Sequence, residues 1–134
     1  MKTPESMENY LETILMLSHS RAAIRSIDIA NELVYSKPSV SIAMKKLRAE
    51  GHIDVDDNGY IKLTDSGYEI AQKTYDRHIL FSDWLVFLGV DREIAVNDAC
   101  KIEHSMSDES FLAIQKHIED WKHGLYKQRS KNGN

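Results

Sequence analysis

Residues 26–63 read SIDIANELVYSKPSVSIAMKKLRAEGHIDVDDNGYIKL, and the spacing of their apolar residues decides the fold. The first eight residues have the spacing of a short helix, with Ser26 as the expected N-cap. The expected buried face of this helix consists of Ile27, Ala30 and Leu33. A second helical pattern, residues 37–50, has Pro38 in its first turn, which tolerates the missing N–H, and Gly51 directly after its end. The stretch therefore begins as two helices joined by a short turn.

After Gly51 the apolar period changes from that of a helix to that of a strand. Residues 52–63 alternate apolar and polar side chains on both sides of Asn58-Gly59, which is a strong signal for a β-hairpin. The expected buried stripe of the helix before it consists of Val40, Ala43, Met44 and Leu47. Helices followed by such a hairpin are typical of a winged helix-turn-helix.

Further helices are expected on both sides of this stretch. Residues 5–17, ESMENYLETILML, have apolar residues at helical spacing and a polar face that carries Asn9 and Glu12. Beyond the hairpin, Thr64 is the expected N-cap of a long helix that ends before Gly89. The last two helices are expected at about Arg92–His104 and from about Ser107 onward.

The sequence thus predicts a mainly α fold with a small β-hairpin wing. We expect a winged helix-turn-helix DNA-binding domain at residues 1–72 and a helical domain at residues 73–134. Several apolar residues of the second domain exceed the needs of one small core, and some of them are expected in a homodimer interface. They are Ile79, Leu80, Trp84, Leu85, Phe87, Leu88, Phe111, Leu112, Ile114 and Ile118.

The composition excludes several classes of protein. The 134 residues are 42% hydrophobic and 28% charged, as in an ordinary globular protein, and no stretch is long and apolar enough for a membrane span. One cysteine cannot form an internal disulfide, and no secretory signal is visible, so a cytoplasmic protein is expected. The net charge of −4 argues against a basic coat that binds nucleic acid without specificity.

One segment nevertheless forms a local basic patch. Residues 34–48 contain four cations and no acid, and their leading turn presents short hydroxyl groups. A recognition helix places its N-terminal residues in the major groove, where hydroxyls and backbone N–H groups hold phosphates. The expected DNA contacts are Ser36, Lys37, Pro38, Ser39, Ser41 and Lys45. The alternative is the solvated face of an ordinary surface helix, which the hairpin directly behind it disfavours.

A second constellation has the chemistry of a metal site. Cys100, Glu103 and His104 stand at i, i+3 and i+4 of one expected helix and therefore share a face. Thiolate, carboxylate and imidazole are donors to transition metals, although such a triple also arises by chance. Two other interpretations use Cys100. It could act as a redox sensor in a regulator without metal, or pair with His104 as nucleophile and base of an enzyme. The enzyme is disfavoured because no Gly-rich oxyanion turn lies nearby.

Several motifs resemble the diphtheria-toxin-repressor family, whose members are metal-activated bacterial transcriptional repressors. The resemblance covers about residues 4–125, and its motifs are SMENYLETILML, SKPSVSIAMKKL, LTDSG, YDRH and NDACKIEHSMSD. The longer iron-type relatives carry an SH3-like domain, so the resemblance implies the two-domain form of the manganese transport regulators. It also implies a regulator of metal homeostasis genes.

The resemblance implies a set of metal ligands, namely Asn9, Glu12, His78, Cys100, Glu103 and His104. The set is a hybrid, because cysteine at position 100 is iron-type, whereas Glu12 is manganese-type. A thiolate softens a site that the manganese branch builds with a carboxylate, and Asn9 removes a negative charge. We therefore expect Fe(II) first and Mn(II) second, with Co(II), Ni(II) or Zn(II) binding in vitro. The expected partners are a second copy of the chain and a double-stranded, palindromic DNA operator.

Overall fold

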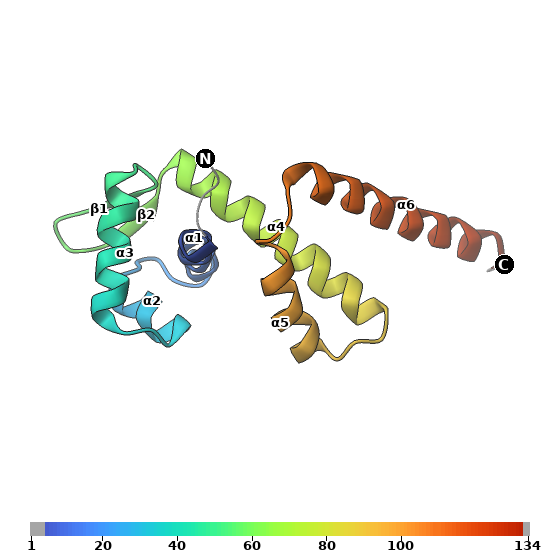
Figure 1. Cartoon of the computed structure of the whole chain (residues 1–134), viewed down its shortest axis with the longest axis horizontal. Coiled ribbons are helices and arrows are strands. Elements are labelled where there is room, and N and C mark those ends of the chain that lie inside the picture. Colours follow the sequence, from blue (N-terminus) through green and yellow to red (C-terminus); the bar gives the residue numbers. More distant parts are fainter. Residues whose placement is uncertain (1–4, 133–134) are drawn as a thin grey trace. The chain divides into compact units, whose positions relative to one another are not determined.

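The computed structural model describes residues 5–132 and consists of helices with one small hairpin, as predicted (Figure 1). The elements are α1 (Glu5–Ser18), α2 (Ser26–Leu33), α3 (Lys37–Ala49), β1 (Ile53–Val55), β2 (Ile61–Leu63), α4 (Asp65–Phe87), α5 (Arg92–Ile102) and α6 (Asp108–Asn132). They form two compact units, Met1–Asp76 (unit 1) and Arg77–Asn134 (unit 2). Within residues 5–132, every helix is too short or too polar to cross a membrane.

The core of unit 1 is built by the apolar faces of its helices and by the inner side of the hairpin. The predicted face of α1 is buried, namely Met7, Tyr10, Leu11, Ile14, Leu15 and Leu17. The predicted stripe of α3 is also buried, with Val40 and Leu47 fully inaccessible. Each such side chain contributes about 1.5–3 kcal/mol to folding. Burial raises the pKa of Tyr10, and neighbouring Tyr35 adds to this effect.

Helix α2 differs from the prediction at its start and in its buried face. It begins at Ser26 itself, with Arg25 as the N-cap, and the Asp28 carboxylate accepts a hydrogen bond of 2.9 Å from the Arg25 N–H. Ile29 is fully buried, whereas Ile27 is 38% exposed. Ile29, Ala30 and Leu33 also have helical spacing, and packing of α2 against α1 and α3 selects them over Ile27.

Helix α3 begins at Lys37 as predicted and ends at Ala49, one residue before the predicted end. Ser36 is its N-cap, with its side chain accepting a hydrogen bond of 3.3 Å from the Ser39 N–H, and Pro38 lies in the first turn. Gly51 follows the C-cap with a φ of +81°, a conformation that glycine adopts without steric cost. The predicted basic helix is therefore formed, with Pro38 in its first turn and Gly51 just past its end as expected.

The wing is a two-stranded antiparallel hairpin in which Asp54 pairs with Lys62. The inner residues Ile53 and Ile61 are buried. Its connection is a turn closed by the Gly59 N–H to the Asp56 carbonyl at 3.0 Å, with Gly59 at a φ of +80°. Asn-Gly thus belongs to a three-residue loop with a left-handed glycine, which is another common hairpin connection.

The start of α4 is fixed against the beginning of the wing. Thr64 is the predicted N-cap, and its hydroxyl accepts from the Gly67 N–H at 3.2 Å while donating to the Gly51 carbonyl at 2.7 Å. A Cβ atom at Gly67 would lie 1.9 Å from the His52 carbonyl oxygen, so only glycine fits. The polypeptide chain therefore enters α4 through a close contact between backbones.

Unit 2 contains the second half of α4 together with α5 and α6. Phe81, Ala99 and Phe111 form its buried centre, and the rings of Phe81 and Phe111 meet edge to face at 5.9 Å between centroids. The Ser107 hydroxyl accepts from the Ser110 N–H at 3.2 Å, which confirms the predicted start of α6. Helix α5 ends at Ile102, two residues before the predicted end at His104.

Candidate metal centre and recognition helix

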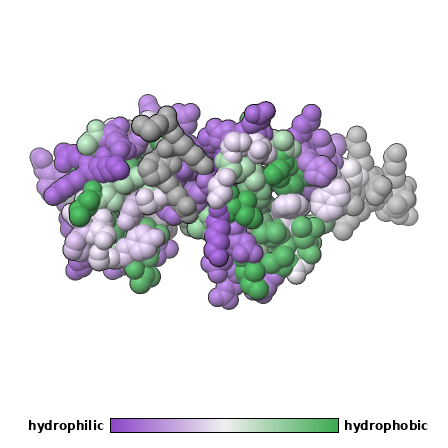
Figure 2. Space-filling view, in the orientation of Figure 1, coloured by the Kyte–Doolittle hydropathy of each residue, from purple (hydrophilic) through white to green (hydrophobic). Residues whose placement is uncertain are grey.

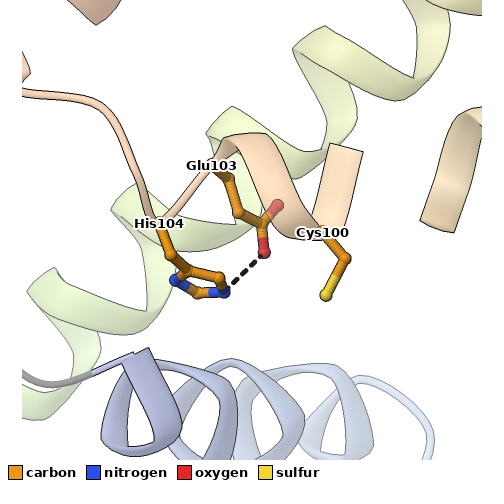
Figure 3. A group of neighbouring side chains, drawn as sticks. All are labelled: Cys100, Glu103 and His104. Atoms are coloured by element: carbon orange, nitrogen blue, oxygen red, sulfur yellow. Dashed lines mark ion pairs between the residues drawn. The ribbon is translucent and has the colours of Figure 1, made fainter. Parts of the chain in front are cut away.

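Cys100, Glu103 and His104 come together at the C-terminal end of α5 (Figure 3). Each offers one ligand atom, and these atoms lie within 4.8 Å of one another. Cys100 belongs to α5, and Glu103 is the C-cap of that helix with helical angles of φ −59° and ψ −28°. Because these angles continue the helical path, the three side chains stay on one side although the helix ends earlier than predicted.

The carboxylate of Glu103 joins two imidazole rings within unit 2. Its Oε2 lies 3.1 Å from Nδ1 of His78 on α4, and its Oε1 lies 3.1 Å from Nε2 of His104. The Glu103 side chain is fully buried, and that of His104 is 1% exposed. A buried carboxylate is costly unless it is paired, so these two rings account for its position.

Arg77 holds the connection between α5 and α6. One terminal nitrogen of its guanidinium donates to the carbonyl oxygens of Glu103 and Met106, both at 3.0 Å, and the other pairs with Asp108 at 2.5 Å. The same group lies over the ring of Phe111, 4.7 Å from its centroid. Arg77 thereby fixes the backbone that carries Glu103. No local sequence pattern indicated this role, although Arg77 lies within the YDRH motif, beside His78.

The geometry of this cluster fits a transition-metal ion. Two ligands of one ion, each bound at ~2.0–2.3 Å, can be at most about 4.6 Å apart, so the observed spread of up to 4.8 Å needs little adjustment. Thiolate, carboxylate and imidazole together are a borderline-soft donor set. His78 reaches the same carboxylate and adds a second imidazole. These four side chains form the candidate metal cluster of unit 2.

The two remaining predicted ligands, Asn9 and Glu12, belong to α1 of unit 1. The backbone carbonyl of Asn9 accepts a hydrogen bond of 2.8 Å from the Thr13 hydroxyl. Glu12 is one of the buried charged residues of the chain. Their part in binding metal stays a prediction.

All of the predicted DNA-contacting residues lie in α3 or at its N-cap and are exposed. They are Ser36, Lys37, Pro38, Ser39, Ser41 and Lys45. The Ser36 hydroxyl donates to the Ser39 hydroxyl at 2.8 Å, so both hydroxyl groups already take part in the N-terminal cap of α3. Their contact with DNA stays a prediction.

A winged helix-turn-helix with a basic recognition helix, joined to helices that bear a metal-ligand cluster, defines a metal-responsive DNA-binding regulator. Residues 2–61 match the model of the iron dependent repressor N-terminal DNA binding domain. Residues 64–128 match that of the iron dependent repressor metal binding and dimerisation domain. The chain belongs to the iron-dependent repressor family, as its sequence motifs indicate, and is a metal-dependent transcriptional regulator.

Individual relatives agree with this assignment. An uncharacterized HTH-type transcriptional regulator of Methanocaldococcus jannaschii is 34% identical over 120 residues, which cover 88% of this chain and 96% of that protein. The regulator MntR of Bacillus subtilis is 36% identical over 107 residues, 80% of this chain and 75% of that protein. A solved manganese-dependent transcriptional repressor in complex with manganese matches with a TM-score of 0.76 and 27% identity. The match covers 84% of this chain and 52% of the solved one, so the chain spans about half its length.

Proposed function

We propose that this chain represses metal homeostasis genes by binding a palindromic DNA operator as a homodimer when it is loaded with a divalent transition metal. The observation that carries the proposal is the cluster of His78, Cys100, Glu103 and His104 in unit 2. The exposed basic side of α3 supplies the DNA-binding surface in unit 1.

The proposed metal is Fe(II), with Mn(II) second. The Cys100 thiolate favours Fe(II), because Mn(II) prefers harder oxygen donors. In favour of Mn(II), one matched solved structure is a manganese-dependent repressor in complex with manganese. Co(II), Ni(II) and Zn(II) suit the same donors in vitro. A bound cation would supply positive charge that holds the buried carboxylate of Glu103 and both imidazoles together.

Coupling between metal and DNA needs a ligand from each unit. We propose that Glu12 of α1 completes the site, with Asn9 nearby on the same helix, so that ligation fixes the recognition helix relative to unit 2. The two recognition helices of a dimer must be about 34 Å apart, or a multiple of this, to enter successive major grooves. A coupling free energy of only ~1–3 kcal/mol would change DNA affinity roughly fivefold to a hundredfold.

Unit 2 has surface suited to the homodimer. Hydrophobic side chains gather over its helices on the face drawn in Figure 2. Of the apolar residues predicted for an interface, Phe111 and Ile118 are buried within the chain. Four of them are at least 40% exposed, namely Ile79, Phe87, Leu88 and Leu112. An exposed apolar surface of this kind is typical of a protein interface.

Metal titration of DNA binding tests the proposal. The full chain is equilibrated anaerobically with a reductant and a randomised duplex library, and Fe(II), Mn(II) or buffer is added. We expect selective enrichment of palindromic sequences only with metal, and at lower concentrations of Fe(II) than of Mn(II). Equal enrichment without metal would contradict the proposal. It would favour the alternative regulator that senses redox state through Cys100, which would respond to oxidant instead.

A further inference from the structure

One large apolar residue lies in the middle of the basic side of α3. Ile42 is 69% exposed, and among the described residues only Val34 is a more exposed large hydrophobic side chain. The buried stripe that includes Val40 and Ala43 faces the other way. Ile42 therefore contributes nothing to the core of unit 1. Packing within the unit does not explain why a large apolar residue stands at this position.

The neighbours of Ile42 on this side are those of a nucleic-acid contact. Pro38, Lys45 and Lys46 stand at i−4, i+3 and i+4, so they share its face, and all three are exposed. The hydroxyls of Ser36 and Ser39, one turn earlier, are hydrogen-bonded to each other at 2.8 Å. Ile42 is thus an exposed apolar group with two kinds of polar neighbour. Its lysine neighbours suit phosphates, and the nearby hydroxyls are already engaged in the helix cap.

In the major groove, the apolar group on a base edge is the 5-methyl of thymine. The other groups at that edge are hydrogen-bond donors and acceptors, which an isoleucine cannot satisfy. We propose that Ile42 is a specificity-determining residue that reads thymine by contact with this methyl group. The proposal rests on the proposed function, because it requires α3 to enter the major groove.

The experiment removes the methyl group of thymine and the side chain of Ile42 separately. Metal-loaded full chain first enriches a duplex from a randomised library. That duplex is then synthesised with deoxyuridine in place of each thymidine in turn, which deletes only the methyl group. For the wild type, we expect at least one substitution in each half-site to weaken binding roughly fourfold, the value of one buried methyl group. The Ile42→Ala variant should bind the thymidine and deoxyuridine duplexes equally at that position.

Two further variants sharpen the comparison. Lys45→Ala should weaken binding to both duplexes by the same factor and keep the thymidine preference, because a phosphate contact does not read bases. Ile42→Gln, taken through a new selection, should replace thymine by adenine at the contacted position, since a Gln side chain pairs with adenine. Unfolding midpoints of the Ile42 variants should equal that of the wild type, because the side chain is exposed.

The outcomes separate the inference from the function on which it rests. If metal-loaded protein enriches no sequence, DNA recognition by α3 fails and the role of Ile42 fails with it. If a sequence is enriched but Ile42→Ala keeps the same loss on methyl deletion, only the reading of thymine is overturned, and Ile42 is an ordinary exposed side chain. Loss of the difference in Ile42→Ala alone supports the inference.

Discussion

Nδ1 of His78 lies 3.1 Å from Oε2 of Glu103, which links two residues 25 positions apart in sequence. This contact joins α4 to the end of α5 within unit 2. The buried carboxylate of Glu103 has its second imidazole contact with His104. Both rings are therefore held close to the donor atoms that we propose bind the metal, before any ion is added.

The first prediction concerns the ligands themselves. His78→Ala and His104→Ala should abolish metal-dependent DNA binding while leaving the dimer intact, because each removes a proposed donor but not the apolar interface. Isothermal titration with Co(II) would measure metal binding, DNA-binding titrations would measure operator affinity, and sedimentation would measure the dimer. His117→Ala, which changes an exposed histidine of α6, is the matched control and should behave as wild type. Unchanged metal-dependent binding in His78→Ala would refute the site.

A second prediction concerns Arg77, a positioning residue. Arg77→Ala should lower the free energy of unfolding by about 2–4 kcal/mol, because it leaves two carbonyl oxygens without their donor. It should also weaken Co(II) binding about 10- to 100-fold, by loosening the backbone of Glu103. Arg77→Lys should recover only part of both properties, since an ammonium lacks the planar fork of a guanidinium.

Arg92 supplies the control for this experiment. Its contact with Asp83 is 3.8 Å long and its side chain is 65% exposed, so Arg92→Ala should change stability by less than about 0.5 kcal/mol. Equal effects of the two substitutions in denaturant unfolding would mean that the hydrogen bonds of Arg77 contribute no more to stability than the exposed contact of Arg92.

The third prediction concerns the basic side of α3. Lys45→Ala should weaken operator binding and reduce the slope of log affinity against log salt by about one, as expected for the loss of one phosphate contact. The exposed Lys116 of α6 is the control, and its replacement by Ala should leave the slope unchanged. Fluorescence anisotropy at several salt concentrations measures both. An unaltered slope in Lys45→Ala would place this side chain off the DNA.

A fourth prediction uses two glycines with opposite surroundings. Gly67→Ala should destabilise the chain by about 2–3 kcal/mol, because the added Cβ would collide with the His52 carbonyl. Gly124→Ala should stabilise it by up to about 1 kcal/mol, since this helical position is open and alanine is the better helix former. Thermal unfolding would show the two shifts in Tm, and the same sign for both would contradict the structure.

A fifth prediction concerns Val34, which joins α2 to α3. It has a φ of +57°, a left-handed conformation that is unfavourable for a β-branched residue, and its side chain is 88% exposed. Val34→Gly should therefore raise the free energy of unfolding by about 0.5–1 kcal/mol. A decrease measured by denaturant unfolding would show that the side chain makes a stabilising contact which its exposure conceals.

Local sequence patterns predicted most of the fold, because its elements follow their own periodicities. The stripe of α3, the cap at Thr64, the start of α6 near Ser107 and the hairpin are all present. The choice of Ile29 over Ile27 was not predictable, since both fit a helix and only the partners of α2 decide between them. The left-handed Val34 was also missed, because nothing in its chemistry favours that conformation.

The candidate site was predictable only where its residues are neighbours in sequence. The spacing of Cys100, Glu103 and His104 indicated a shared face, and the structure brings their donor atoms together. Contacts across the fold left no such signal. The bond from His78 to Glu103 and the hydrogen bonds of Arg77 connect residues at least 25 positions apart, and only family resemblance pointed to His78.

The early end of α5 has a consequence for how such regulators could change. Cys100 lies within the helix, but Glu103 and His104 lie in the short connection to α6. Two of the proposed donors are therefore positioned by the backbone of this connection, which Arg77 holds through the carbonyl oxygens of Glu103 and Met106, and not by helical hydrogen bonding alone. A substitution that shifts this connection would move both donors relative to Cys100 and would thereby change which ions the site prefers.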